Sequence, residues 1–445
     1  MKKIFQSISK PKYFIAPLSI FLLSFILRLL FISKGPFHLD TLNLSIKAAH
    51  FAQTFELQGL FGSGYPLTVI LGGIFVFLGK ILNFNDPIIC INFMSVLTSS
   101  IALLYFYVIA EKIYSRTSAT FATVLFSITP IFLGLSVYGK SHTPSIMFLL
   151  ISLYYLLLFK ELNKKSLLIL SALALGAMGA CRLQDMILMI IPISYALLFL
   201  NVTSSHPPSR HTSNLLKTFL IFFSFTSLFI IIFHSPFFLH GNYAEYKLQW
   251  DSFFKQGVSS NYRGFTSDAF LLSFNYILQS TSILGVSLSV CGLFITFLKN
   301  KKLTLFLLLW FCIPFLFYGN LWTTAPRFFL LILPPLFLAM GQALSIGFQK
   351  TLIHKTVSVL TITLLAFIYL TSIMPAIHFR ASNQLLPDFY QWVASTTENN
   401  AYIISGDDRL FIEYYSHRKS FPKPLENLKL SKESLTLIES NLNQY

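Results

Sequence analysis

The chain has 445 residues, of which 54% are hydrophobic and only 11% are charged. A soluble domain usually carries about a quarter charged residues. Apolar runs of about 20 residues, each long enough to cross a ~30 Å hydrocarbon layer, recur from Tyr13 to Met374. These features exclude a soluble globular enzyme, a disordered chain and a disulfide-stapled secreted domain, and they predict a polytopic membrane protein.

The net charge of +16 reflects 33 Lys and Arg residues that lie singly or in short clusters between the apolar runs. This distribution is typical of charges that set membrane topology and not of a nucleic-acid-binding surface. Four cysteines occur in or at the end of apolar segments, without the spacing of a disulfide framework or a metal site. The first apolar run is too long for a signal peptide, so it is expected to be a retained first span.

Eleven transmembrane helices are expected from the apolar runs. They fall at 13–32, 88–110, 119–138, 144–159, 167–181, 186–200, 218–238, 270–298, 303–319, 328–347 and 356–374. A further apolar stretch, 66–82, is predicted to be interfacial or re-entrant, because the basic turns EKIYSR, KELNKK and KNKK then all face the cytoplasm. The N-terminus is therefore predicted to be cytoplasmic and the C-terminal tail extracytoplasmic.

The first outer loop, 33–87, begins with an acidic residue that is placed to cap a helix. Asp40 is expected to be the N-cap of an amphipathic helix. Its apolar face would consist of Leu44, Ala48, Phe51 and Phe55, and would lie along the membrane surface.

The tail, 375–445, differs abruptly in composition from residues 1–374. Its segment AYIIS is typical of a strand, and DDRLFIEYY of a short helix. The sequence therefore predicts a transmembrane domain, 1–374, followed by a small α/β-like extracytoplasmic domain, 375–445.

Residues 64–159 carry several motifs of a known family. They contain an outer-loop Pro-Leu in GYPL, the basic turn EKIYSR and the span ending SITPIFLGLSVYG, and a later segment reads APRFFLLILPPLFLA. This pattern resembles the GT-C integral-membrane glycosyltransferases, in particular the bacterial group related to protein O-mannosyltransferases and to the lipid A aminoarabinose transferase. Arg28 and Asp40 are similar to the family's early arginine and outer-loop aspartate, and the tail is similar to the small domain that follows the last span.

Members of this family move a sugar from a polyprenyl-phosphate carrier to an acceptor outside the membrane. The resemblance implies an all-α polytopic GT-C-like fold and a hexosyl or pentosyl transferase of the plasma membrane. Its partners would be a lipid-linked sugar donor, an envelope lipid, glycan or protein acceptor, and membrane lipids, with no nucleic acid. Many relatives carry an aspartate in the outer turn where this chain reads GKSHTPS. No metal or other cofactor is expected, and a divalent metal ion stays open as an alternative.

The chemistry requires a carboxylate to accept the acceptor's proton and cations to hold the leaving phosphate. Asp40 is expected to be the general base of an inverting transfer. The expected ligands of the donor phosphate are Arg327, Arg182, Arg28 and Lys140. Accessory or acceptor-binding candidates are His142, Asp185, Glu56, Glu245 and Asp251, with His38, Asn43 and Lys47 as further neighbours of Asp40.

Simpler accounts exist for most of these residues. Arg28 would snorkel to the interface or pair with Asp40, Arg182 would form a local ion pair with Asp185, and Arg327 would anchor a helix at the interface. Two other functions also stay open, a transporter or lipid flippase and an inactive relative. The sequence shows no repeated halves, and its ionisable groups gather at the outer membrane ends, which favours an enzyme over a transporter.

Overall fold

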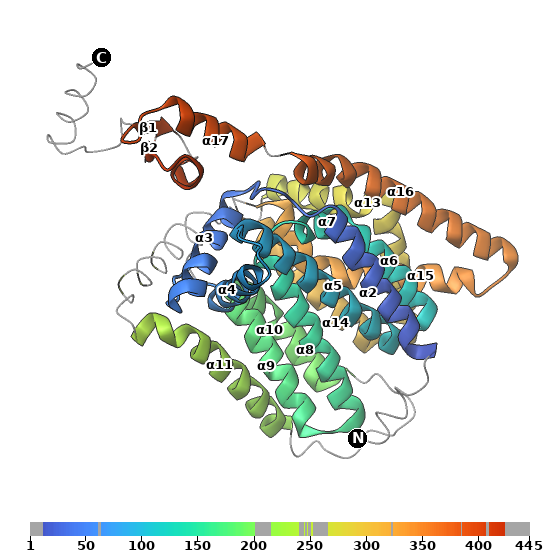
Figure 1. The fold of residues 1–445 in the computed structure, drawn as a ribbon. Coiled ribbons are helices and arrows are strands. Elements are labelled where there is room, and N and C mark those ends of the chain that lie inside the picture. Colours follow the sequence, from blue (N-terminus) through green and yellow to red (C-terminus); the bar gives the residue numbers. More distant parts are fainter. Residues whose placement is uncertain are drawn as a thin grey trace.

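The computed structural model describes residues 12–60, 64–200, 215–239, 266–321, 324–383, 385–405 and 409–422, with isolated positions between 240 and 265. These residues form a helical bundle with a small appendage at one end (Figure 1). The bundle consists of α2 (Lys12–Leu30), α3 (Leu39–Thr54), α4 (Pro66–Ile81), α5 (Pro87–Ile113), α6 (Arg116–Ile128), α7 (Pro130–Ser136), α8 (His142–Leu162), α9 (Lys165–Cys181), α10 (Leu183–Phe199), α11 (Leu215–Leu239), α13 (Ser267–Lys299), α14 (Lys301–Gly319), the 3-10 helix η3 (Pro326–Ile332), α15 (Leu333–Phe348) and α16 (Leu352–Ser382).

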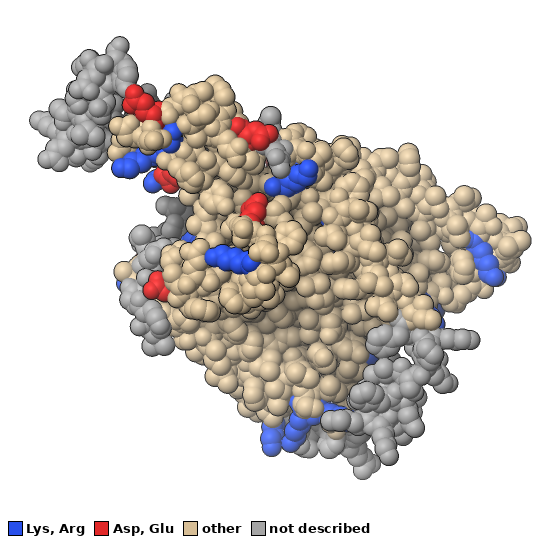
Figure 2. Space-filling model, in the orientation of Figure 1, with Lys and Arg blue, Asp and Glu red and all other residues tan. Residues whose placement is uncertain are grey.

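The bundle has the dimensions of a multi-pass membrane protein. Within the described residues, seven helices are long and apolar enough to cross a membrane, or up to eight if the bent pair α6–α7 is one span. Each of the eleven predicted spans falls on a helix or on this bent pair, whereas the number of crossings stays a prediction. The helical flank in Figure 2 shows few charges, and Lys, Arg, Asp and Glu gather mainly at its ends.

The predicted span 119–138 is broken in its middle. The axes of α6 and α7 differ by 63°, because Pro130 cannot continue the hydrogen-bond ladder and holds Thr129 in an extended conformation. Arg28 donates a hydrogen bond of 2.8 Å from Nη2 to the carbonyl of Ser127, in the last turn before the bend. Its side chain is fully buried, so Arg28 stabilises the end of α6 and forms no pair with Asp40.

The apolar face of α3 packs inside the protein. Leu44 and Ala48 are buried against α4 and α5. The helices approach closely because α4 has glycine at 72, where a Cβ atom would lie 2.9 Å from that of Ala48. The prediction that this face lies along the membrane surface was therefore wrong for Leu44 and Ala48. Phe55, by contrast, ends the helix in a left-handed conformation and is 76% exposed.

The appendage follows α16, which continues beyond residue 374 to Ser382. It contains α17 (Leu385–Thr396), β1 (Tyr402–Ser405), α18 (Arg409–Phe411), the π turn η4 (Ile412–Ser416) and β2 (Lys419–Pro422). Strands β1 and β2 are parallel, with Tyr402 opposite Lys419, and β1 is the strand that AYIIS predicts. Tyr390, Phe411 and Ile412 pack with Leu42 of α3 and Ile88 of α5, which fixes the appendage to this end of the bundle.

Candidate active site

The loop between α7 and α8 is fixed by hydrogen bonds on both sides of the backbone. The carbonyl of Gly139 accepts a hydrogen bond of 2.7 Å from Thr41 Oγ1, and its amide donates one of 2.7 Å to Asn92 Oδ1. A Cβ atom at residue 139 would lie only 2.2 Å from Ile91 Cγ2. Glycine therefore allows the loop to approach α3 and α5 closely, and this positions Lys140 beside the first turn of α3.

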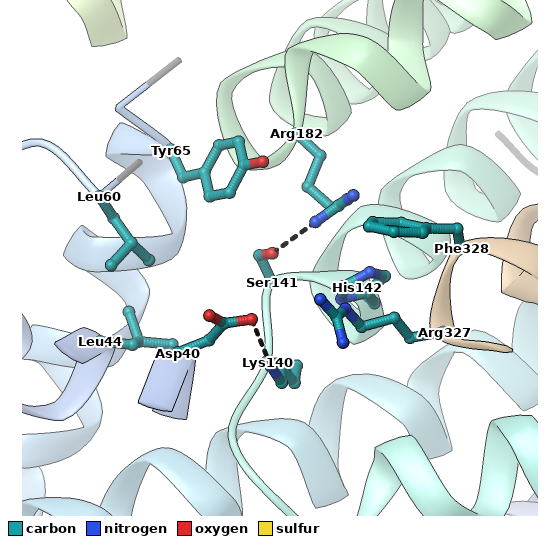
Figure 3. A pocket seen from close by; sticks show the side chains of 10 residues that line it. All are labelled: Asp40, Leu44, Leu60, Tyr65, Lys140, Ser141, His142, Arg182, Arg327 and Phe328. Atoms are coloured by element: carbon teal, nitrogen blue, oxygen red, sulfur yellow. Dashed lines mark hydrogen bonds and ion pairs between the residues drawn. The ribbon is translucent and has the colours of Figure 1, made fainter. Parts of the chain in front are cut away.

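A cavity of about 170 Å³ lies where α3, this loop, the α9–α10 turn and η3 meet (Figure 3). Among the residues that line it are three basic side chains, a single carboxylate and a histidine. The lining residues are Asp40, Leu44, Leu60, Tyr65, Lys140, Ser141, His142, Arg182, Arg327 and Phe328. The excess of positive charge makes the cavity suitable for an anionic ligand.

Asp40 lies in the first turn of α3 and is not the N-cap of this helix. The N-cap is His38, whose Nδ1 accepts a hydrogen bond of 3.1 Å from the Asp40 amide, so the predicted cap was wrong. The Asp40 carboxylate instead accepts a hydrogen bond from Lys140 Nζ through Oδ2. Within the described part of the chain, no hydrogen bond is made to Oδ1, which leaves this oxygen available to a ligand.

The charges of this cluster follow from its burial and its close contacts. Burial raises the pKa of Asp40, but Lys140, together with His38 and Arg327, more than offsets this and holds the pKa below its usual value of 3.8. Burial lowers the pKa of Lys140 to about 7, although Asp40 opposes this change. Burial and the charge of Lys140 lower the pKa of His38 to about 4. At neutral pH Asp40 is therefore ionised and His38 is neutral.

Arg182 is positioned by a network of buried side chains in the α9–α10 turn. Its Nε donates a hydrogen bond of 2.8 Å to Asp185 Oδ2, and its Nη1 donates one of 3.0 Å to Ser141 Oγ. Asp185 also accepts hydrogen bonds from Ser145 through Oδ2 and from Tyr318 through Oδ1. Both of its oxygens are thus occupied, whereas Arg182 Nη2 is buried without a hydrogen-bond partner.

Within the described ranges, two further cavity residues are not paired with a carboxylate. His142 at the start of α8 is only 6% exposed, and both of its ring nitrogens are buried without a hydrogen bond. Arg327 lies in the first turn of η3, with Nη1 3.3 Å from His38 Nε2, and no carboxylate of the described residues pairs with it. Buried polar groups are nearly always hydrogen-bonded, so the unpartnered groups of His142 and Arg182 indicate a polar ligand.

The structure brings together Asp40, Lys140, His142, Arg182, Asp185 and Arg327, as expected for one site, and separates the other candidates from them. Arg28 and Glu56 do not line the cavity, and Glu56 is exposed with Oε2 3.4 Å from His50 Nε2. Asp251 is exposed and does not line the cavity, and Glu245 lies outside the described residues. The aromatic rings of Tyr65 and Phe328 also line the cavity, and no role is expected for them from the sequence, although they occur in the motifs GYPL and APRFF.

Residues 75–231 match the model of the dolichyl-phosphate-mannose-protein mannosyltransferase family, and no curated protein matches the sequence. The fold is similar to that of ArnT from Cupriavidus metallidurans bound to undecaprenyl phosphate. This comparison has a TM-score of 0.66 and 9% identity, over 98% of this chain and 89% of ArnT.

The fold is also similar to that of the archaeal oligosaccharyltransferase AglB from Archaeoglobus fulgidus in complex with an inhibitory peptide and a dolichol-phosphate. The TM-score is 0.61 and the identity 14%, over 94% of this chain and 65% of AglB. The same oligosaccharyltransferase in complex with zinc and sulfate gives a TM-score of 0.60 at 14% identity, over 91% of this chain and 62% of that protein. This chain therefore spans about two thirds of the length of the archaeal enzyme.

Proposed function

We propose that this chain, which has the GT-C fold of membrane glycosyltransferases, transfers a sugar from a polyprenyl-phosphate carrier to a lipid, glycan or protein acceptor. The structures of ArnT and AglB contain undecaprenyl phosphate and a dolichol-phosphate, which supports a carrier of this kind. The observation that carries the proposal is a cavity in which three basic side chains, one of them with an unpartnered buried guanidinium nitrogen, face a single ionised carboxylate.

The two arginines of the cavity are the ligands that we propose for the carrier phosphate. A phosphate that leaves the anomeric carbon gains negative charge, which guanidinium groups stabilise through paired, charge-assisted hydrogen bonds. Arg182 is held for this task by Asp185 and Ser141, and its free Nη2 remains to bind a phosphate oxygen. Arg327 lines the same cavity from η3.

Asp40 is the general base in this proposal. Its Oδ1 accepts the proton of the acceptor hydroxyl while the acceptor oxygen bonds to the anomeric carbon and the bond to the carrier phosphate breaks. A retaining double displacement would require a second carboxylate as nucleophile. Among the described residues that line the cavity, Asp40 is the single carboxylate. Asp185 does not line the cavity and uses both of its oxygens in hydrogen bonds. We therefore expect inversion of the anomeric centre.

The charge distribution supports an extracytoplasmic site in the plasma membrane. Helix α8 begins at the cavity with His142 and has Lys160 in its last turn, so the cavity and the basic turn that follows α8 lie at opposite ends of the helix. At the basic end, Lys112 of α5 pairs with Glu161 of α8. Because basic turns stay in the cytoplasm, we propose that the cavity and the appendage lie on the outer side and that α2 starts in the cytoplasm.

The archaeal oligosaccharyltransferase has been solved in complex with zinc, but the residues of this cavity do not fit such an ion. Divalent cations require several carboxylate, imidazole or thiolate ligands. The described residues contain no group of three or more His, Cys, Asp and Glu side chains that could hold a metal ion. In addition, Lys140 Nζ occupies Asp40 Oδ2. We derive no step through a metal ion.

The test is transfer from a panel of radiolabelled polyprenyl-phosphate sugars in membranes that contain the full chain. Asp40→Asn should lower the rate by about 10²- to 10⁴-fold and should still bind the carrier. The matched control is Glu413→Gln, which removes a carboxylate that pairs with Arg409 in the appendage and does not line the cavity.

Three outcomes separate the parts of this proposal. No transfer from any carrier by folded wild-type protein would refute the function. Unchanged transfer by Asp40→Asn would retain the function and exclude Asp40 as the base, with His142 of the cavity lining as the next candidate. A product with the anomeric configuration of the donor would refute the inverting mechanism.

A further inference from the structure

Lys140 is a buried cation whose ammonium group is directed at a carboxylate and an imidazole. Its side chain is 2% exposed. Its Nζ donates a hydrogen bond to Asp40 Oδ2 and lies 2.8 Å from His38 Nδ1. Since His38 is neutral at neutral pH and also accepts the Asp40 amide at Nδ1, this nitrogen acts as an acceptor for the ammonium.

Hydrogen bonds of neighbouring residues hold Asp40 and Lys140 together independently of their own two side chains. Thr41, which follows Asp40, donates its hydroxyl to the carbonyl of Gly139, which precedes Lys140. The Lys140 amide donates a hydrogen bond of 3.2 Å to Ser95 Oγ in α5. Asp40 and Lys140 are thus joined through bonds between their sequence neighbours, and the ammonium lies beside the carboxylate before any substrate binds.

We propose that the Lys140 ammonium is the built-in counter-cation of Asp40, that it replaces a bound divalent metal ion at this carboxylate, and that transfer consequently needs no metal. This inference rests on the proposed function. It makes Lys140 a positioning residue that acts through Asp40, and it removes Lys140 from the ligands expected for the donor phosphate.

Two physical consequences follow from a lysine at this point. An ammonium group carries one charge where a metal ion carries two, so Asp40 alone balances it and little attraction remains for a phosphate. The donor phosphate then depends on Arg327 and Arg182. No carboxylate of the cavity lining neutralises Arg327, and Arg182, which pairs with Asp185, retains one free nitrogen. The ammonium also fixes Oδ2, so that Oδ1 is the oxygen that receives the proton.

Several ionisable groups face the ammonium and contribute to its charge state. Asp40 favours the protonated form of Lys140, and the two arginines of the cavity disfavour it. The remaining groups around it are His38, His142 and, with its ring 5.8 Å from Nζ, Tyr138. Any change of the charge at residue 140 should therefore appear first in the titration of Asp40.

The first test measures metal binding and needs no activity. The full chain is purified in detergent, treated with EDTA, and dialysed against radioactive Mn²⁺ beside Asp40→Asn. We expect the two proteins to bind the same amount of Mn²⁺. Binding by the wild type that Asp40→Asn abolishes would show a metal at this carboxylate and would overturn the proposal.

The second test compares Lys140→Met, which removes the charge at similar length, with Lys140→Arg, which keeps it. Lys140→Met should shift the acidic limb of the pH profile of kcat to higher pH by about one to three units. The reason is that a neighbouring positive charge lowers the pKa of a carboxylate, here Asp40, by this amount. Added Mn²⁺ should not restore its rate. Lys140→Arg should retain the acidic limb of the wild-type profile, and wild-type transfer should continue in EDTA.

The proposal is overturned if Lys140→Met keeps the wild-type rate and profile, or if EDTA abolishes wild-type transfer and Mn²⁺ restores it. Both outcomes leave the glycosyltransferase function intact. If wild-type protein transfers no sugar at all, the function fails, and the dialysis experiment still decides whether Asp40 holds a metal ion. The dialysis and EDTA experiments also remain decisive if Lys140→Met does not fold.

Discussion

The role of Arg182 can be separated from that of its ion pair by a double substitution. Arg182→Gln removes a guanidinium group whose partner, Asp185, has a side chain that is only 8% exposed. Breaking a buried ion pair on one side costs about 3–5 kcal/mol, because the remaining charge is left uncompensated. The single variant should therefore be strongly destabilised. Adding Asp185→Asn removes the orphaned charge and should recover most of this loss.

The affinity for the donor should respond differently from the stability. A hydrogen bond to a charged group contributes about 1.5–3 kcal/mol, which corresponds to a rise of about 10- to 150-fold in the donor KM when Arg182 no longer holds the phosphate. This rise should persist in the Arg182→Gln/Asp185→Asn double variant, because neither new side chain supplies a cation.

The assay pairs thermal unfolding in detergent with transfer kinetics at varied concentrations of the carrier-linked sugar. Arg409→Gln is the matched control, since Arg409 is an exposed arginine paired with Glu413 in the appendage. A double variant with a wild-type donor KM would refute the reasoning, because it would show that Arg182 only neutralises Asp185.

Three further predictions concern the surroundings of the site. Because the pKa of Lys140 is lowered to about 7, its ammonium is present below this pH and is lost above it. Wild-type kcat should therefore fall as the pH rises through about 7, and Lys140→Arg should abolish this fall; a flat wild-type profile would contradict it. Gly139→Ala should lower the free energy of unfolding by about 1–3 kcal/mol, since the new Cβ would lie 2.2 Å from Ile91 Cγ2; an unchanged unfolding midpoint would show that the loop has room. Arg28→Met should lower the free energy of unfolding by about 1–3 kcal/mol, because it leaves the Ser127 carbonyl unpaired. The donor KM should not change, and a raised KM would indicate that Arg28 binds the phosphate.

Hydropathy predicted the helices well because a membrane interior requires long apolar segments whose backbone bonds are satisfied internally. It failed at the α6–α7 bend, where residues on both sides of Pro130 are apolar and only the proline signals a break. It also failed for α3, because an apolar face looks the same whether it contacts lipid or another helix. The glycine at 72, which permits close packing, provided the local signal.

The ionisable residues that line the cavity and the local pair of Arg182 with Asp185 could be predicted from the sequence, but the pairing of Asp40 with Lys140 could not. Asp40 and Lys140 lie 100 residues apart in the chain, and no local pattern indicates that the α7–α8 loop reaches α3. Lys140 was expected to bind a phosphate because a lysine in an outer turn needs an anionic partner, and the partner is a carboxylate of the same chain. The cap of α3 was assigned to Asp40 because aspartate is a common N-cap, whereas the histidine before it uses its ring nitrogen for the same bond.

The packing of the appendage against α3 has a consequence for the order in which the protein is made. Leu42, half a turn from Asp40, is covered by Tyr390, Phe411 and Ile412, which the ribosome adds some 350 residues later. Arg327 also enters the cavity late. A chain still in synthesis can bring Asp40 and Lys140 together but lacks one arginine of the cavity and the cover of α3. The cavity and its cover are therefore complete only after residues 390–412 have been synthesised, and a shorter nascent chain lacks part of both.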